Sequence, residues 1–167
     1  MTSSARPDAR WLVECGEWPT LEAQRAAARS LLSRLLGGEV SVAHDARGAP
    51  CLPDRPGLFV SLSHCRRAVA AAVSPERRVG IDVESRRRVS EGLMERVCTV
   101  DEFAAVRASA DPTMAFLRFW TRKEAVLKCR GTGIRGFSSM QSALADADFE
   151  ILDIDCENPD VVASLAL

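Results

Sequence analysis

Two short segments that follow each other almost without a break constrain the fold most strongly. Residues 58–65, LFVSLSHC, and residues 67–73, RAVAAAV, both have the pattern of strands, and a single arginine separates them. Strands joined this closely pair side by side, so the sequence predicts an antiparallel pair near the middle of the chain.

A helix is predicted on each side of this pair. Residues 19–38 carry a leucine stripe between a capping threonine, Thr20, and Gly37, which ends the helix. Asp111 and the proline after it mark the start of a second helix, which Gly131 ends. Both helices have recognisable caps at their two ends.

The order of all predicted elements indicates the fold class. The other predicted elements are strands over residues 39–44, 79–85, 149–155 and 161–167 and short helices over residues 91–97 and 101–109. Helix, strands, strand, helices and strands in this order favour an α+β fold with a largely antiparallel sheet. Each half has a helix and strands, which allows a structural duplication with a joint near residues 74–79, although no sequence similarity supports one.

Composition excludes several classes of function. The net charge of −1 gives no general attraction to nucleic acid or to anionic membranes. Six scattered cysteines without a CxxC pair, and an N-terminus without an apolar core, indicate reduced thiols and a cytoplasmic protein. The longest strongly apolar run, residues 68–73, is far too short to span a bilayer.

The pentapeptide GIDVE, residues 80–84, is a candidate metal site. Side chains alternate along a strand, so Asp82 and Glu84 share one face at about 7 Å between their Cα atoms, while Ile81 and Val83 point into the core. Two such carboxylates can share one hydrated Mg²⁺. The alternative is an ordinary strand whose acidic face meets water.

The chain has only two lysines, Lys123 and Lys128, among its 22 basic residues. Glu124 and Lys128 lie on one side of the predicted helix and would form an i,i+4 pair, which on a solvated face contributes only a few tenths of a kcal/mol. Arginine would serve that purpose equally well. A phosphate site can prefer the compact charge of lysine, so the scarcity of lysine points toward function.

Two further features remain open at this level. His64, at the end of a predicted strand, is either a structural hydrogen-bond partner or a ligand. Arg86, Arg87 and Arg88 form either a solvated turn or a basic patch.

Taken together, VGIDVE and FWTRKEAVLKCRGTG resemble the signature of the 4′-phosphopantetheinyl transferases, in particular a short form of the surfactin-type branch. That signature is Gly-(Ile/Val)-Asp-x-Glu followed by Trp-(Ser/Thr)-x-Lys-Glu-(Ala/Ser)-x-x-Lys. Upstream, SLSHC resembles Asn-x-Ser-His-Ser, with Ser61 in place of the Asn and Cys65 in place of the last Ser. RVCTVDE supplies Glu102, and AARSLLSRLL resembles the helix that contacts coenzyme A.

The resemblance implies two similar α+β halves, residues 1–76 and residues 77–167, in one compact monomer with the active site between them. It implies transfer of 4′-phosphopantetheine from coenzyme A to a serine of an acyl or peptidyl carrier protein, with release of 3′,5′-ADP. The implied cofactor is Mg²⁺, with Mn²⁺ as an alternative ion.

The resemblance also implies roles for single residues. The implied metal ligands are Asp82, Glu84 and Glu124. Glu124, Lys128 and His64 are the implied catalytic residues, with Glu124 as the base, and coenzyme A is held by Arg29, Ser30, Ser63, His64, Lys123 and Lys128. Arg86, Arg87 and Arg88 are expected, from their charge, to dock the carrier.

The chain departs from the family pattern at one phosphate contact, because Ala49 replaces the lysine of a common Gly-Lys-Pro motif. Arg10, Arg25 and Arg47 are candidates to compensate. The intact carboxylates favour an active transferase, whereas this departure slightly favours an alternative function, a non-catalytic relative that binds coenzyme A or a carrier protein. A metal-dependent phosphohydrolase of another fold would explain the acids but not the Trp…Lys-Glu…Lys array.

Overall fold

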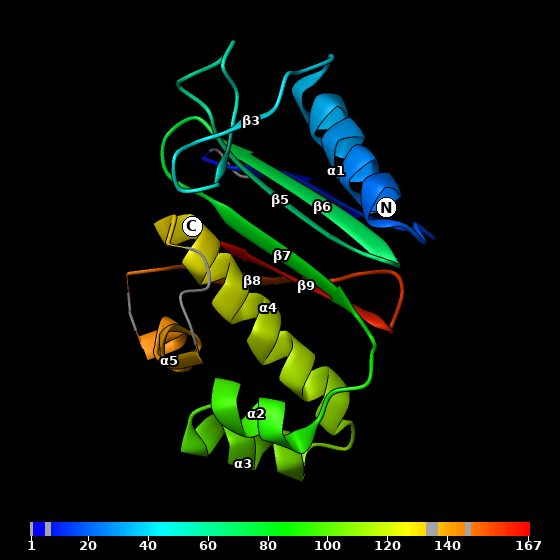
Figure 1. The fold of residues 1–167 in the computed structure, drawn as a ribbon, viewed down its shortest axis with the longest axis vertical. Coiled ribbons are helices and arrows are strands. Elements are labelled where there is room, and N and C mark those ends of the chain that lie inside the picture. The colour runs from blue at the N-terminus through cyan, green and yellow to red at the C-terminus, as the bar shows by residue number, and fades with distance from the viewer. Residues whose placement is uncertain (1, 6–7, 133–136, 146–147) are drawn as a thin grey trace.

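The computed structural model describes residues 2–5, 8–132, 137–145 and 148–167, and two antiparallel sheets form its centre (Figure 1). The first sheet has the order β1-β2-β6-β5 and the second the order β7-β9-β8. The first is built from β1 (Thr2–Ala5), β2 (Arg10–Cys15), β5 (Phe59–Cys65) and β6 (Ala68–Ser74), and the second from β7 (Gly80–Ser85), β8 (Ile151–Ile154) and β9 (Val161–Ala166). The predicted α+β class with antiparallel sheets is confirmed.

Each sheet carries one long helix on its outer face. Helix α1 (Leu21–Leu36) packs on β6 and β5, and α4 (Pro112–Arg130) packs on β7 and β9. Thr20 and Asp111 cap their starts, and Gly37 and Gly131 end them in the left-handed conformation. All four capping residues were predicted from the sequence.

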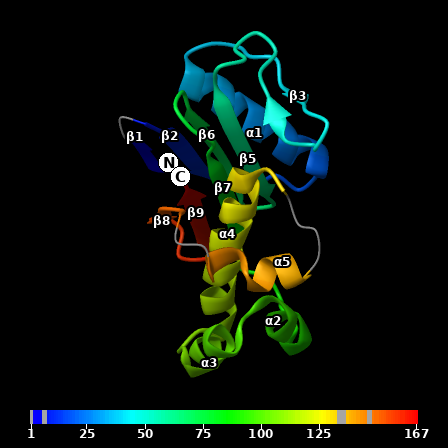
Figure 2. The ribbon, with the colours of Figure 1, turned by 90° about the vertical axis from the view of Figure 1, so that its left-hand side faces the viewer.

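The smaller helices gather beside α4, on the side away from α1 (Figures 1 and 2). They are α2 (Glu91–Val97), α3 (Val100–Ala108), α5 (Phe137–Gln141) and a 3₁₀ turn at Ala143–Ala145. Their apolar side chains form a separate core with Phe116 and Leu117 of α4.

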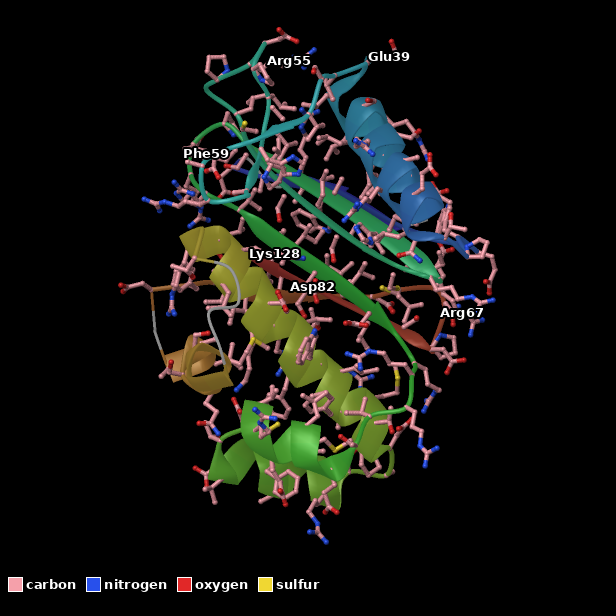
Figure 3. All side chains as sticks on the ribbon, viewed as in Figure 1. Glu39, Arg55, Phe59, Arg67, Asp82 and Lys128 are labelled. Atoms are coloured by element: carbon pink, nitrogen blue, oxygen red, sulfur yellow. The ribbon has the colours of Figure 1, made fainter. Side chains whose placement is uncertain are left out.

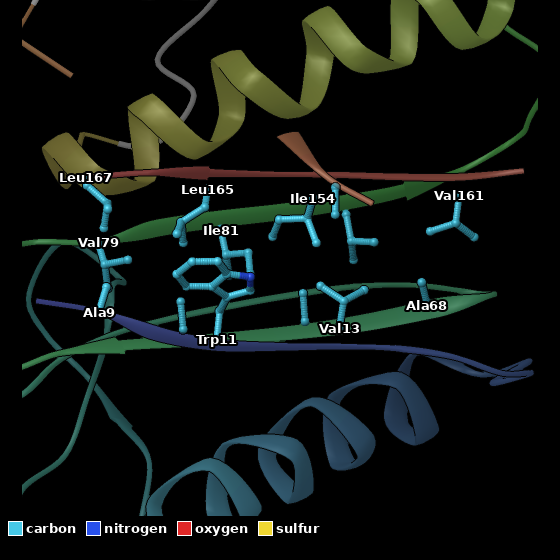
Figure 4. Close-up of a cluster of buried hydrophobic side chains, with 14 residues drawn as sticks. Ala9, Trp11, Val13, Ala68, Val79, Ile81, Ile154, Val161, Leu165 and Leu167 are labelled. Carbon is cyan, nitrogen blue, oxygen red and sulfur yellow. The ribbon is translucent and has the colours of Figure 1, made fainter. Parts of the chain in front are cut away.

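The two sheets face each other across a buried apolar layer (Figure 4). Trp11 and Val13 of β2 meet Ile81 of β7 and Leu165 of β9 in this layer. Strand β6 is buried at every position, because one face meets this layer and the other meets α1. Burial on both faces explains why its sequence is continuously apolar rather than alternating.

The structure differs from the sequence prediction in the first half of the chain. Strands β1 and β2 were not predicted. The strand predicted over residues 39–44 is reduced to β3 (Ala43–His44), which pairs with β4 (Pro50–Cys51). Gly133, the last residue of the FWTRKEAVLKCRGTG segment, lies outside the described residues.

The change from the first sheet to the second falls between Ser74 and Gly80. A division into residues 1–76 and residues 77–167 stays a prediction.

Among the described residues, no helix combines the length and hydropathy of a membrane span.

Candidate active site

Helix α4 lies against strand β7 with backbone touching backbone at Gly80. A Cβ atom at Gly80 would lie 1.9 Å from Ala125 O and 2.6 Å from Cys129 N, so only glycine fits. Positions 82 and 84 share the face of Gly80, because side chains alternate along a strand. The close approach therefore brings Asp82 beside the α4 turn that carries Glu124 and Lys128.

Asp82 is buried at 5% exposure, and its two carboxylate oxygens have different surroundings. Oδ1 accepts hydrogen bonds from Ser63 Oγ at 2.8 Å and from Lys128 Nζ at 2.7 Å. Oδ2 is buried and has no hydrogen-bond partner among the described residues. Figure 3 shows Asp82 and Lys128 next to each other between β7 and α4.

Two serines of β5 fasten the free edge of β7. Ser61 Oγ accepts the backbone N–H of Ile81 at 3.0 Å, and Ser63 Oγ accepts that of Val83 at 3.2 Å. The hydroxyls thus replace the strand that β7 lacks on this side. The sequence resemblance assigned no role to Ser61 and assigned Ser63 to the binding of coenzyme A. In the structure, the hydroxyl hydrogen of Ser63 is directed to Asp82.

Glu84 and Glu124 complete an acidic group around Asp82. The pKa of Glu124 is raised to about 7, mainly by burial and then by the charge of Asp82, with a smaller contribution from Glu84 and against the lowering effect of Lys128. Burial also raises the pKa of Glu84, to which Asp82 adds, against the lowering effect of Arg87. The mutual influence shows that the three carboxyl groups share one electrostatic environment.

Asp82 offers a buried oxygen that fits a divalent cation, but the three carboxyl groups are not arranged around a common point. In the described part of the chain, no three His, Cys, Asp or Glu side chains form a ready metal cage. Lys128 Nζ donates to Oδ1 of Asp82, and Arg87 donates to both oxygens of Glu84. The unpartnered Oδ2 of Asp82 is the oxygen that a hard cation such as Mg²⁺ would satisfy.

The two lysines have separate surroundings. Lys128 Nζ reaches Asp82 and the carbonyl of Ile81 at 3.0 Å, and its side chain is 27% exposed. Lys123 is fully buried, and its Nζ donates to Glu102 at 2.6 Å and to the carbonyls of Val97 and Gln141. The predicted role of Lys123 at the phosphate needs correction, because its donors are used to join α2, α3 and α5 to α4.

A cleft of about 730 Å³ opens from Lys128 toward α1 and the loop that carries β3 and β4. Its basic lining residues are Arg25, Arg29, Arg47, Arg78 and Lys128, together with His44 and His64. The one acidic lining residue, Asp45, accepts the backbone N–H groups of Arg47 and Ala49. The cleft is therefore suited to a ligand with several negative charges.

Three of the six residues predicted to bind coenzyme A line this cleft, namely Arg29, His64 and Lys128, whereas Ser30, Ser63 and Lys123 do not. Burial lowers the pKa of His64, with Lys128 and Arg25 adding to the effect. His64 Nδ1 lies 3.2 Å from Gln24 Oε1. Ser30 is exposed and is not a lining residue, so the structure does not bring it to the site.

The candidates for compensating Ala49 divide in the same way. Arg25 and Arg47 line the cleft, whereas Arg10 lies on β2 and is not a lining residue. Arg78 was missed from the sequence. Its only signal was its place directly before the strand that carries the acids.

The predicted docking patch of Arg86, Arg87 and Arg88 is largely engaged within the protein. Arg86 donates to Asp111 and to Asp160, and so ties the end of β7 to the start of α4 and to the turn before β9. Arg87 pairs with Glu84, so Arg88 alone keeps an exposed charge without an ion pair among the described residues.

The structure thus combines two packed antiparallel sheets with a basic cleft that Lys128 connects to the buried carboxylate of Asp82. The chain is a member of the 4′-phosphopantetheinyl transferase superfamily, whose sequence profile matches residues 78–163. The profile of the N-terminal domain of 4′-phosphopantetheinyl transferases matches residues 22–74.

Curated relatives carry the same name. The chain is 36% identical to the 4′-phosphopantetheinyl transferase HetI of Nostoc sp. over 136 residues, covering 75% of this chain and 57% of that protein. It is 34% identical to the 4′-phosphopantetheinyl transferase AcpT of Salmonella typhi over 125 residues, covering 72% of this chain and 65% of that protein. With Sfp of Bacillus subtilis the identity is 29% over 111 residues, covering 64% and 49%. The chain thus spans less than two thirds of the length of these relatives.

Proposed function

We propose that this protein is a 4′-phosphopantetheinyl transferase that moves phosphopantetheine from coenzyme A to a serine hydroxyl of an acyl or peptidyl carrier protein. The proposal depends chiefly on one observation. Asp82 has an unpartnered buried oxygen, Oδ2, and its other oxygen accepts from Lys128, which lines the basic cleft. Such a site suits a ligand that brings both phosphates and a divalent cation.

The basic cleft accounts for binding of coenzyme A, which carries a diphosphate and a 3′-phosphate. Arg25, Arg29, Arg47 and Arg78 are distributed along its walls, and Lys128 stands where the cleft meets Asp82. This distribution favours a diphosphate near Lys128 and the remaining phosphate nearer α1. Burial and the charges of Lys128 and Arg25 lower the pKa of His64, and the negative charge of a bound phosphate would act in the opposite direction.

Asp82, Glu84 and Glu124 are the proposed ligands of Mg²⁺ or Mn²⁺. When bound, the ion would neutralise charge on the diphosphate oxygens during phosphoryl transfer. For Asp82 to serve, its free Oδ2 would ligate while Ser63 keeps hold of Oδ1.

Glu124 is the proposed general base. With its pKa raised to about 7, it is poised to take a proton near neutral pH. The serine oxygen then forms a bond to the β-phosphorus, the bond from that phosphorus to the adenylate oxygen breaks, and 3′,5′-ADP leaves. Lys128 would meet the charge that develops on the diphosphate.

Incubation of the protein with coenzyme A, Mg²⁺ and a panel of apo carrier proteins tests the proposal by intact mass. We expect one carrier to gain the mass of one phosphopantetheine group, and the gain to disappear with EDTA or with Asp82→Ala. Binding of coenzyme A without transfer to any carrier would instead favour a non-catalytic relative. The panel also decides whether the carrier belongs to fatty acid, polyketide or nonribosomal peptide synthesis.

We further propose a monomer in the cytoplasm. All six cysteines are free thiols, which supports a reducing compartment.

A further inference from the structure

Arg87 is engaged with a proposed metal ligand and an aromatic ring at the same time. Its Nε lies 3.2 Å from Glu84 Oε2, and its Nη2 lies 3.4 Å from Glu84 Oε1. Its guanidinium carbon lies 5.6 Å from the centre of the Trp120 ring. The side chain of Glu84 is 18% exposed and that of Arg87 is 39% exposed.

This geometry places a guanidinium where a metal ion needs an oxygen. Both oxygens of Glu84 accept from Arg87, which places a positive charge against this carboxylate and so opposes the approach of a divalent ion. Lys128 faces Asp82 in a comparable way, but it leaves Oδ2 of that residue free. Of the two acids on β7, Glu84 is therefore the one whose two oxygens are both engaged by a cation.

We propose that Arg87 is a positioning residue that competes with the divalent ion for Glu84 and so sets the affinity of the site for that ion. This inference rests on the proposed function, because the metal ligands belong to it. Arg87 keeps Glu84 neutralised before the ion arrives, and it moves aside when the ion binds.

The surroundings of Arg87 keep the free-energy cost of leaving Glu84 low. The side chain has open solvent beside it, and the ring of Trp120 gives the guanidinium a face on which to rest after it leaves Glu84. The two neighbouring arginines lack this combination of contacts. Arg86 is fixed by Asp111 and Asp160, and Arg88 is exposed without an ion pair among the described residues.

The test is Mn²⁺ binding without coenzyme A or carrier, measured from the electron paramagnetic resonance signal of free Mn²⁺. The proteins are the wild type, Arg87→Gln and the matched control Arg88→Gln, which removes the same charge from the next residue. Since partly exposed pairs are weak, we expect Arg87→Gln to lower the Mn²⁺ Kd by about three- to tenfold. Arg88→Gln is expected to stay within about twofold of the wild type, because its charge acts only through solvent.

The fluorescence of Trp120 provides a second readout. Titration with Mg²⁺ should change the tryptophan emission of the wild type, and the change should be absent in Trp120→Phe and in Arg87→Gln. Arg87→Lys keeps the charge but cannot bridge both oxygens, so its Kd should fall between those of the wild type and Arg87→Gln.

The outcomes separate the two proposals. If Arg87→Gln binds Mn²⁺ as the wild type does, or more weakly, the competition is overturned while the metal site stands. If neither the wild type nor the variants bind Mn²⁺, the metal site of the proposed function fails, and this inference fails with it.

Discussion

Ser63 Oγ donates a buried hydrogen bond of 2.8 Å to Asp82 Oδ1 and thereby leaves Oδ2 as the unpartnered oxygen of that carboxylate. The same hydroxyl accepts the N–H of Val83 at 3.2 Å. One side chain therefore orients the acid and secures the strand that carries it.

Ser63→Ala should weaken both divalent-ion binding and transfer, because Asp82 loses the contact that orients it. Ser61→Ala is the matched control, since Ser61 makes the same kind of backbone contact, to Ile81, without touching Asp82. Each variant should lose about 1–3 kcal/mol of unfolding free energy through an unsatisfied backbone N–H. Mn²⁺ titration and chemical denaturation separate the effects; equal loss of Mn²⁺ affinity in both variants would contradict the role of Ser63.

Glu124→Gln should stabilise the metal-free protein at pH 8 and change little at pH 5. The pKa of Glu124 is raised from 4.5 to about 7 in the folded state, so its contribution to stability is present below pH 4.5 and is lost as the pH rises through 7. The gain at pH 8 should reach up to about 3 kcal/mol. Urea denaturation in EDTA at the two pH values measures it. A gain in unfolding free energy of the same size at both pH values would contradict the view that ionisation of Glu124 destabilises the fold. Added Mg²⁺ should reduce the difference in stability between the variant and the wild type at pH 8.

The two lysines should separate stability from function. Lys123→Met should cost about 3–5 kcal/mol, because it leaves Glu102 without its buried partner, while the folded fraction keeps its affinity for Mn²⁺ and coenzyme A. Lys128→Met should lose coenzyme A affinity and transfer. Denaturation and coenzyme A binding by calorimetry give the two quantities. Loss of coenzyme A binding in folded Lys123→Met would reinstate Lys123 as a phosphate contact.

Ala49→Lys should improve binding of coenzyme A, because Ala49 lines the basic cleft and a lysine there would add a further positive charge to it. We expect a KM for coenzyme A lowered about threefold or more, with a steeper dependence on salt. Ser30→Lys adds the same charge outside the cleft and serves as the control. A similar improvement in both variants would mean that overall charge, rather than the cleft, is responsible.

Arg86→Ala should lower the Tm and leave the KM for the carrier unchanged, since Arg86 binds Asp111 and Asp160. Arg88→Ala should leave the Tm unchanged and is the variant that reports on docking. Thermal melting and carrier titration distinguish the two, and a raised carrier KM with an unchanged Tm in Arg86→Ala would return Arg86 to the docking surface.

Much of the fold was predictable because its signals are local. Thr20 and Gly37 delimit α1 through contacts within a few residues, and Asp111 and Gly131 do the same for α4. Strand β2 was not predicted because it is stabilised by pairing with β6, which is distant in sequence.

The site was predictable to the extent that periodicity decides it. Alternation placed Asp82 and Glu84 on one face, and the helical repeat placed Glu124 beside Lys128. Periodicity could not show that Lys123, one residue away from Glu124, is buried in separate surroundings with Glu102. Nor could it show that Arg87 folds back onto Glu84, or that Arg78 enters the cleft, because these contacts depend on how distant segments pack.

The contact of Gly80 with the carbonyl of Ala125 has a consequence for which substitutions the protein can accept. The spacing between the acidic strand and the helix that carries Glu124 is set at this point by main-chain atoms rather than by side chains. Side chains elsewhere in the core can therefore change without altering this spacing, whereas a single methyl group added at this glycine would push the strand and the helix of the proposed site apart.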